Sequence, residues 1–124
     1  DLVRSRGLGD VYKRQYLIKS NGDGVELWNK TFGGSSDDIG NSVQQTIDGG
    51  YIITGSTESF GDGSEVFLVK TDGNGNEQWN QTFGWISNEV GNSVQQTFDD
   101  GYIITGGKNG DVFLIKTDPD GNIN

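Results

Sequence analysis

With 124 residues, 31% of them hydrophobic and 21 of them glycine, the chain can bury only a thin, turn-rich core, which excludes a helical bundle. The absence of Cys and His excludes disulfides, thiolate chemistry and Ser-His or Cys-His nucleophile systems, so we expect no catalytic residue in this segment. The formal charge of −9 argues against nucleic acid as a partner, and no apolar run is long enough for membrane insertion.

The first element in chain order is a basic segment that differs from the rest of the sequence. Residues 5–15, SRGLGDVYKRQ, resemble a translated sequencing adapter, as an untrimmed metagenomic read would carry. The internal repeat begins only at Tyr16, immediately after this segment. We therefore expect residues 1–15 to be non-native, the alternative being a native basic arm that binds a partner.

From Tyr16 onward the sequence repeats with a period of 51 residues. GNSVQQTIDGGYIITG at 40–55 returns as GNSVQQTFDDGYIITG at 91–106, with fourteen of sixteen residues identical. VFLVKTD at 66–72 returns as VFLIKTD at 112–118 with an offset of 46, so the connection before the last copy is five residues shorter. A repeat of this length is typical of stacked units that bury their apolar faces on one another.

Each repeat predicts four antiparallel strands, here 41–47, 51–57, 66–72 and 77–83. Asp-Gly and Gly-Asn-Gly turns join them in pairs, which is the usual signal of hairpins. YIIT and VFLV are apolar on both faces, which predicts inner strands between neighbouring sheets. The fourth strand alternates apolar and polar residues, which predicts a half-buried outer strand whose Trp79, like Trp28 one period earlier, packs between units.

The string VFLVKTDGNGNEQWNQTFG, together with the Gly-Asn-Ser-Val segment and DGGYIITGST, resembles the β-propeller repeats of bacterial and archaeal secreted or surface proteins. The resemblance implies an all-β fold, a fragment of a β-propeller built of antiparallel four-stranded blades, with an open array of sheets as the alternative. It also implies an extracellular or cell-surface location. About two and a quarter blades would be present: strands three and four in 16–33, a complete blade in 42–84, strands one to three in 93–118, and the start of the next turn in 119–124.

Candidate ligand-binding residues are those that break the repeat or gather charge. Trp85 replaces Gly34 in the connection after the fourth strand and is the aromatic residue best placed to face a ligand. Asp37 and Asp38 form a local acidic cluster in the equivalent connection, and Glu89 belongs to the same face.

The turn at 72–76 has the spacing of a calcium loop, because Asp72, Asn74 and Asn76 place side-chain oxygens at alternate positions. It departs from the EF-hand pattern, with Glu77 where that loop has Gly and Phe83 where it has its bidentate Glu. Asn, Asp and Gly are also the residues that hairpin turns favour. We therefore predict a turn role, with calcium as the alternative and no other cofactor.

Two further sets recur at equivalent positions. Asn29 and Asn80 match the N-glycosylation acceptor pattern, or simply fill the polar face of their strand. The other set closes the third strand of each copy, and we predict that its members are structural partners of nearby carboxylates: Lys19, Lys70 and Lys116.

Near-perfect repetition without an unusual titratable residue favours a non-catalytic module of an extracytoplasmic protein, acting as a scaffold, adhesion or ligand-binding surface. The expected partners are a protein or a carbohydrate, besides the remaining blades of the same chain. One alternative is part of a propeller enzyme, carbohydrate-active or quinone-dependent, whose catalytic residues lie outside this segment. Another is a calcium-stabilised surface array.

Overall fold

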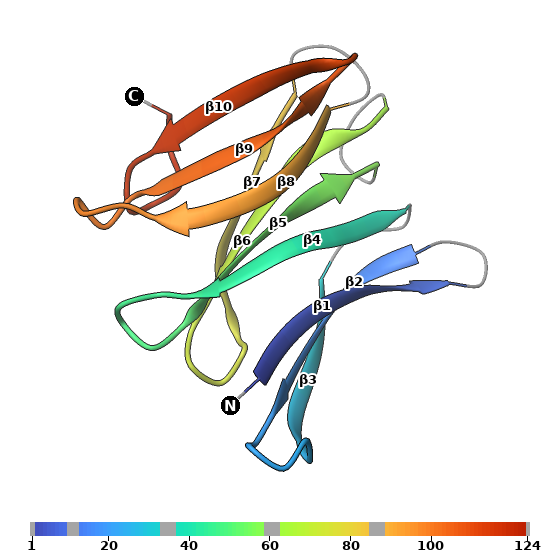
Figure 1. The fold of residues 1–124 in the computed structure, drawn as a ribbon, viewed down its shortest axis with the longest axis vertical. Helices are drawn as coiled ribbons and strands as arrows, with labels where there is room; N and C mark the ends of the chain where they lie inside the picture. The colour runs from blue at the N-terminus through green and yellow to red at the C-terminus, as the bar shows by residue number, and fades with distance from the viewer. Residues whose placement is uncertain (1, 10–12, 33–36, 59–62, 85–88, 124) are drawn as a thin grey trace.

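The computed structural model describes residues 2–9, 13–32, 37–58, 63–84 and 89–123, and this part of the chain is all-β and antiparallel (Figure 1). No helix that could cross a membrane is found within it. Its strands are β1 (Leu2–Gly9), β2 (Lys13–Ser20), β3 (Glu26–Phe32), β4 (Asp38–Gln45), β5 (Tyr51–Thr57), β6 (Glu65–Thr71), β7 (Glu77–Phe83), β8 (Glu89–Gln96), β9 (Tyr102–Lys108) and β10 (Asp111–Thr117).

The strands form three sheets that follow one another along the chain. The first sheet has the order β1-β2-β3, the second β4-β5-β6-β7 and the third β10-β9-β8. The second sheet contains the four strands that one repeat predicts, with β5 and β6 in the middle and β7 at an edge. The all-β, antiparallel prediction is thereby confirmed, and so are the inner and outer strand positions.

Strand β1 pairs with β2 along its whole length, from Leu2 opposite Ser20 to Gly9 opposite Lys13. It holds the place beside β2 that β5 holds beside β6 in the second sheet. Because this pairing concerns geometry and not the origin of the segment, the expectation that residues 1–15 are non-native stays a prediction.

The three sheets stack in series, so that the second sheet is covered on both faces (Figure 1). Towards the first sheet it contributes three apolar side chains that pack with Leu17 and Phe32: Ile53, Phe67 and Val69. Towards the third sheet it contributes another three that pack with Tyr102 and Ile104: Ile52, Val66 and Leu68. All six are at most 1% exposed. The prediction that YIIT and VFLV lie between neighbouring sheets is confirmed for the second sheet.

Aromatic rings join each sheet to the next at its hairpin turns. Trp28 of β3 meets Tyr51 of β5 at 5.9 Å between ring centroids, and Trp79 of β7 meets Tyr102 of β9 at 5.8 Å. Each indole also covers a turn glycine of the following sheet, so that a Cβ on Gly75 or Gly121 would come within 2.5 Å of it. The prediction that these tryptophans pack between units is confirmed.

The repeated stretch GNSVQQT, which forms the first strand of its sheet, also joins that sheet to the next, because its polar side chains form hydrogen bonds with the following sheet. Ser42 Oγ and Gln44 Oε1 of β4 accept hydrogen bonds from the backbone N–H groups of Val94 and Gln96 in β8, at 3.4 and 3.1 Å. Asn41 donates from its side-chain amide to the Gly91 carbonyl at 2.8 Å. Since unpaired backbone groups at a sheet edge invite association with other chains, these contacts protect the edge of the third sheet.

Candidate functional site

Of the predicted ligand-binding residues, Trp85 lies outside the described residues. Asp37 accepts a backbone hydrogen bond from Glu58 at 2.9 Å through its carbonyl. Asp38 is the first residue of β4, is fully buried, and accepts a hydrogen bond from the Thr57 hydroxyl, its direct neighbour across the sheet. The prediction that Asp38 lies in a connection is therefore wrong, because it begins a strand and a cross-strand partner satisfies its carboxylate inside the fold.

Glu89 occupies the same place one period later. It is the first residue of β8, is fully buried, and forms an ion pair at 3.3 Å with Lys108, again its neighbour across the sheet. The prediction that Glu89 lies on a connection is wrong for the same reason. Where the second sheet has Asp38 and Thr57, the third has Glu89 and Lys108, so both members of the buried pair differ between the copies.

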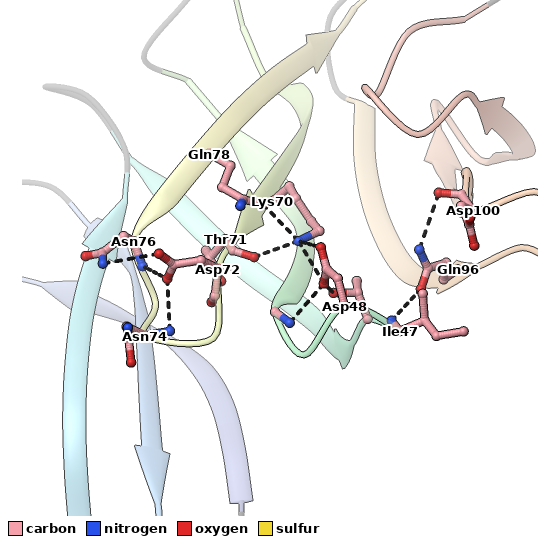
Figure 2. Close-up of polar contacts among 12 residues, drawn as sticks. Ile47, Asp48, Lys70, Thr71, Asp72, Asn74, Asn76, Gln78, Gln96 and Asp100 are labelled. Atoms are coloured by element: carbon pink, nitrogen blue, oxygen red, sulfur yellow. Dashed lines mark hydrogen bonds and ion pairs between the residues drawn. The ribbon is translucent and has the colours of Figure 1, made fainter.

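The predicted calcium candidates form a closed turn. Asp72 Oδ1 accepts hydrogen bonds from the backbone N–H groups of Asn74 and Asn76, both at 2.9 Å, and Oδ2 accepts one from the Asn76 amide at 3.3 Å (Figure 2). These bonds, that from the Asn76 backbone first, lower the pKa of Asp72. Asn21 and Asp118 cap their own turns in the same way, which confirms the turn role.

In the described part of the chain, no three His, Cys, Asp or Glu side chains are grouped as a metal site requires. The amide groups of Asn29 and Asn80 donate to the carboxylates of Glu26 and Glu77, three residues earlier on the same strand. Both asparagines are exposed, and glycosylation there stays a prediction.

Lys70, at the end of β6, binds the turn between β4 and β5. Its Nζ lies 3.0 Å from Asp48 Oδ2 and donates to Gln78 Oε1 at 3.0 Å and to the Thr71 carbonyl at 2.7 Å (Figure 2). The Lys70 side chain is only 4% exposed. A hydrogen bond from Thr46, and then those from Gly50 and Lys70, lower the pKa of Asp48 to about 2.

The third sheet repeats this arrangement in a more exposed setting. Lys116 lies 3.0 Å from Asp99, and its side chain is 44% exposed. Hydrogen bonds from Thr97, Lys116 and Gly101 lower the pKa of Asp99 to about 2. The prediction that the recurring lysines are structural partners of carboxylates is thus confirmed for Lys70 and Lys116. Lys19 donates to the Tyr51 hydroxyl of the next sheet at 2.8 Å.

The two turns predict a measurable difference. We expect Asp48→Asn to lower the free energy of unfolding by about 1 kcal/mol, because it leaves the buried Lys70 ammonium without a carboxylate, although the exposed side of Asp48 is screened by solvent. Asp99→Asn is the matched control and should cost less, since Lys116 keeps contact with water. Urea unfolding at neutral pH measures both, and an equal loss in the two variants would contradict the role assigned to burial.

The same carboxylates predict a loss of stability in acid. The folded pKa values of about 2 lie below the ordinary value of 3.8, so the stabilisation is fully present above about pH 4 and is lost as the pH falls towards 2. Unfolding midpoints measured from pH 6 to pH 2 should therefore fall less steeply in the double variant Asp48→Asn, Asp99→Asn than in the parent chain. Parallel curves would rule out this assignment.

A groove of about 350 Å³ lies at the hairpin edge, between the second and third sheets. Its aromatic lining is Trp79 and Tyr102, and it also contains the Asp48–Lys70 pair. The remaining lining residues are Ile47, Gln78, Gln96, Asp100, Pro119 and Asp120. Sequence reasoning missed this site, although comparison of the copies carries a signal: Asp100 stands where the preceding copy has Gly49, and Asp120 where it has Asn74.

Polar contacts fix the wall of the groove that faces β8. Gln96 Oε1 accepts a hydrogen bond from the backbone N–H of Ile47 at 2.8 Å, and the Gln96 amide donates to the carbonyl of Asp100 at 3.3 Å (Figure 2). The first turn of one sheet is thereby tied to the first turn of the next, which positions the groove. The sequence has no significant match to any protein-family model or to any curated protein.

Proposed function

We propose that the chain is a non-catalytic repeat module of an extracytoplasmic protein, part of a β-propeller whose sheets form a scaffold and whose hairpin edge binds a ligand. Three observations support this proposal: the serial stacking of the sheets, the recurrence of their contacts, and the presence of a groove where two of them meet.

The observation that carries the proposal is the outer face of the third sheet. Val112 and Leu114 of β10 are 87% and 65% exposed, whereas their equivalents Val66 and Leu68 are fully buried against the third sheet. Apolar side chains exposed at the positions that a neighbouring sheet covers one repeat earlier favour a surface that another unit covers. The third sheet therefore presents the face with which the second sheet holds its neighbour.

The polar contacts of this face agree with its apolar ones. Ser42 and Gln44 of the second sheet bond to the edge of β8, and their equivalents Ser93 and Gln95 in the third sheet are exposed. A further copy of the unit would receive the same pair of hydrogen bonds. Both parts of the interface are thus repeated, as a ring or an array of units requires.

The titratable groups of the described part support a non-catalytic role. Asp48, Asp99 and Asp72 cap turns, and Asp38 and Glu89 pair across their strands. Each contact has a counterpart in another copy, whereas chemistry at an active site requires different groups that converge on one point.

The architecture can be tested with tandem copies of one period, residues 42–92, in chains of about four to eight units. A propeller closes, so we expect the hydrodynamic radius to stop rising at one copy number, with a sharp increase in unfolding midpoint at the same number. An open array would instead lengthen with every added copy. An array carrying Leu68→Glu in each unit is the control, because it should stay expanded at all lengths; a steady increase in radius of the parent arrays would refute the propeller.

A further inference from the structure

We propose that the groove between the second and third sheets binds an organic cation, the ammonium or guanidinium group of a basic side chain on a partner protein. The inference deepens the binding role proposed above and concerns one groove only. It is argued from a buried hydroxyl, from the charges around it, and from the equivalent place between the first and second sheets.

Tyr102 lines the groove and is only 2% exposed. Among the described residues, none forms a hydrogen bond with its hydroxyl, although buried polar groups are nearly always paired. Its equivalent Tyr51 accepts a hydrogen bond from Lys19, whose ammonium lies 5.6 Å from the centre of the ring. Between the first two sheets, an ammonium of the chain itself therefore occupies the position in question.

Lys70 is the equivalent of Lys19, but it binds Asp48 instead of reaching Tyr102. In this groove the lysine is held by its aspartate turn, so the Tyr102 hydroxyl does not receive the ammonium that Tyr51 receives. A ligand that carries its own ammonium or guanidinium group can donate to the Tyr102 hydroxyl and lie against the face of Trp79, as cations do on aromatic rings.

The charges of the groove favour such a ligand. Asp48, Asp100 and Asp120 all line it, whereas Lys70 is its one basic lining residue among those described and is paired with Asp48. The carboxylates of Asp100 and Asp120 therefore exceed the positive charge among the described lining residues. Burial first, and then the charges of these three aspartates, raise the pKa of Tyr102 to about 12.

Both of these aspartates stand where the preceding copy has an uncharged residue. Asp100 replaces Gly49 and keeps its left-handed backbone, with φ of 65° against 85°, a conformation that favours glycine over aspartate. Asp120 replaces Asn74 at the turn beneath the next indole. The negative charge therefore distinguishes this groove from the corresponding place between the first and second sheets.

The test uses the whole chain labelled with ¹⁵N in its indoles and ¹³C in its tyrosine rings, titrated with n-butylammonium and n-butylguanidinium. We expect saturable shifts of the Trp79 indole and of the Tyr102 ring signals, with Trp28 as the internal reference that does not respond. The neutral isostere n-butanol should produce no saturable shift. Added sodium chloride should weaken the binding of both cations, because partly exposed charges are screened.

Two variants restore the residues of the preceding copy and are therefore compatible with the fold. Asp100→Gly and Asp120→Asn together should raise the apparent Kd for both cations by about fivefold or more, as the loss of two solvent-screened ionic contacts implies. Asp23→Asn, a change of charge in the equivalent turn of the first sheet, is the control and should leave the Kd unchanged. Tyr102→Phe should also weaken binding without loss of stability, since its hydroxyl has no hydrogen-bond partner to lose among the residues that the structure describes.

Three results would overturn the inference: equal shifts with n-butanol, an unchanged Kd in the double variant, or saturable shifts with methyl glucoside and none with the cations. The last would assign the groove to a carbohydrate. None of them would affect the tandem-copy experiment, which tests the architecture without reference to any ligand.

Discussion

Replacing Gly55 by alanine is expected to lower the free energy of unfolding by more than about 3 kcal/mol, because the added methyl group has no space. A Cβ at Gly55 would lie 1.8 Å from the carbonyl oxygen of Ile39, a backbone atom of the neighbouring strand. The register of β4 against β5 shifts between Gly40 and Ser42, next to this contact, so the strand cannot move away without breaking its pairing.

Gly22→Ala is the matched control for this variant. Nothing lies within 4 Å of a Cβ at Gly22, in the turn between β2 and β3, so the change in unfolding free energy should stay within about 0.5 kcal/mol. Urea unfolding followed by circular dichroism measures both variants. Similar stabilities for the two would show that β4 and β5 can separate at the irregular pairing, against the structure described.

Leu68→Ala is expected to cost about 3–4 kcal/mol, the usual penalty for a cavity in a packed core. Leu68 is fully buried between the second and third sheets, where Ile104 and Ile115 belong to the same cluster. Its equivalent Leu114 is 65% exposed on the outer face of the third sheet, so Leu114→Ala should change the stability by less than about 0.5 kcal/mol.

The comparison of Leu68→Ala with Leu114→Ala also tests whether the outer face of the third sheet can hold a further unit. When the chain is continued in register, with residues 79–92 completing the third sheet and one copy of residues 42–92 following, Leu114→Ala should become as costly as Leu68→Ala, because the new unit covers it. If Leu114→Ala stays neutral in the longer chain, the outer face of the third sheet is no docking surface for another unit.

Much of the fold follows from the sequence because packing and turn chemistry act locally. Residues that are apolar on both faces predict central strands, and the turn residues between them predict where the strands end. The tryptophans are predicted at the junctions between sheets because they recur at one position of the repeat and a thin core needs the burial of such large side chains. Each of these inferences depends on neighbours in the chain or on residues one repeat away, which a sequence displays directly.

That Asp38 and Glu89 are buried and begin strands could not be predicted from neighbouring residues in the sequence. A carboxylate near glycines resembles an exposed connection, and its burial depends on a partner across the sheet, Thr57 or Lys108, that is about twenty residues away. The groove required a still wider comparison, because Asp100, Asp120 and Tyr102 belong to the third sheet, whereas the other wall of the groove belongs to the second. Only the stacking of the two sheets brings these walls together.

The contact between an indole and a turn glycine limits how closely one sheet approaches the next at the hairpin edge. It occurs at both junctions, with Trp28 over Gly75 and Trp79 over Gly121, and in each case a methyl group on the glycine would press against the ring. In a longer run of these units the same contact recurs at every junction, so a small change in its thickness is multiplied by the number of units. A substitution at this pair of residues would therefore act on the curvature of such an array at every junction at once.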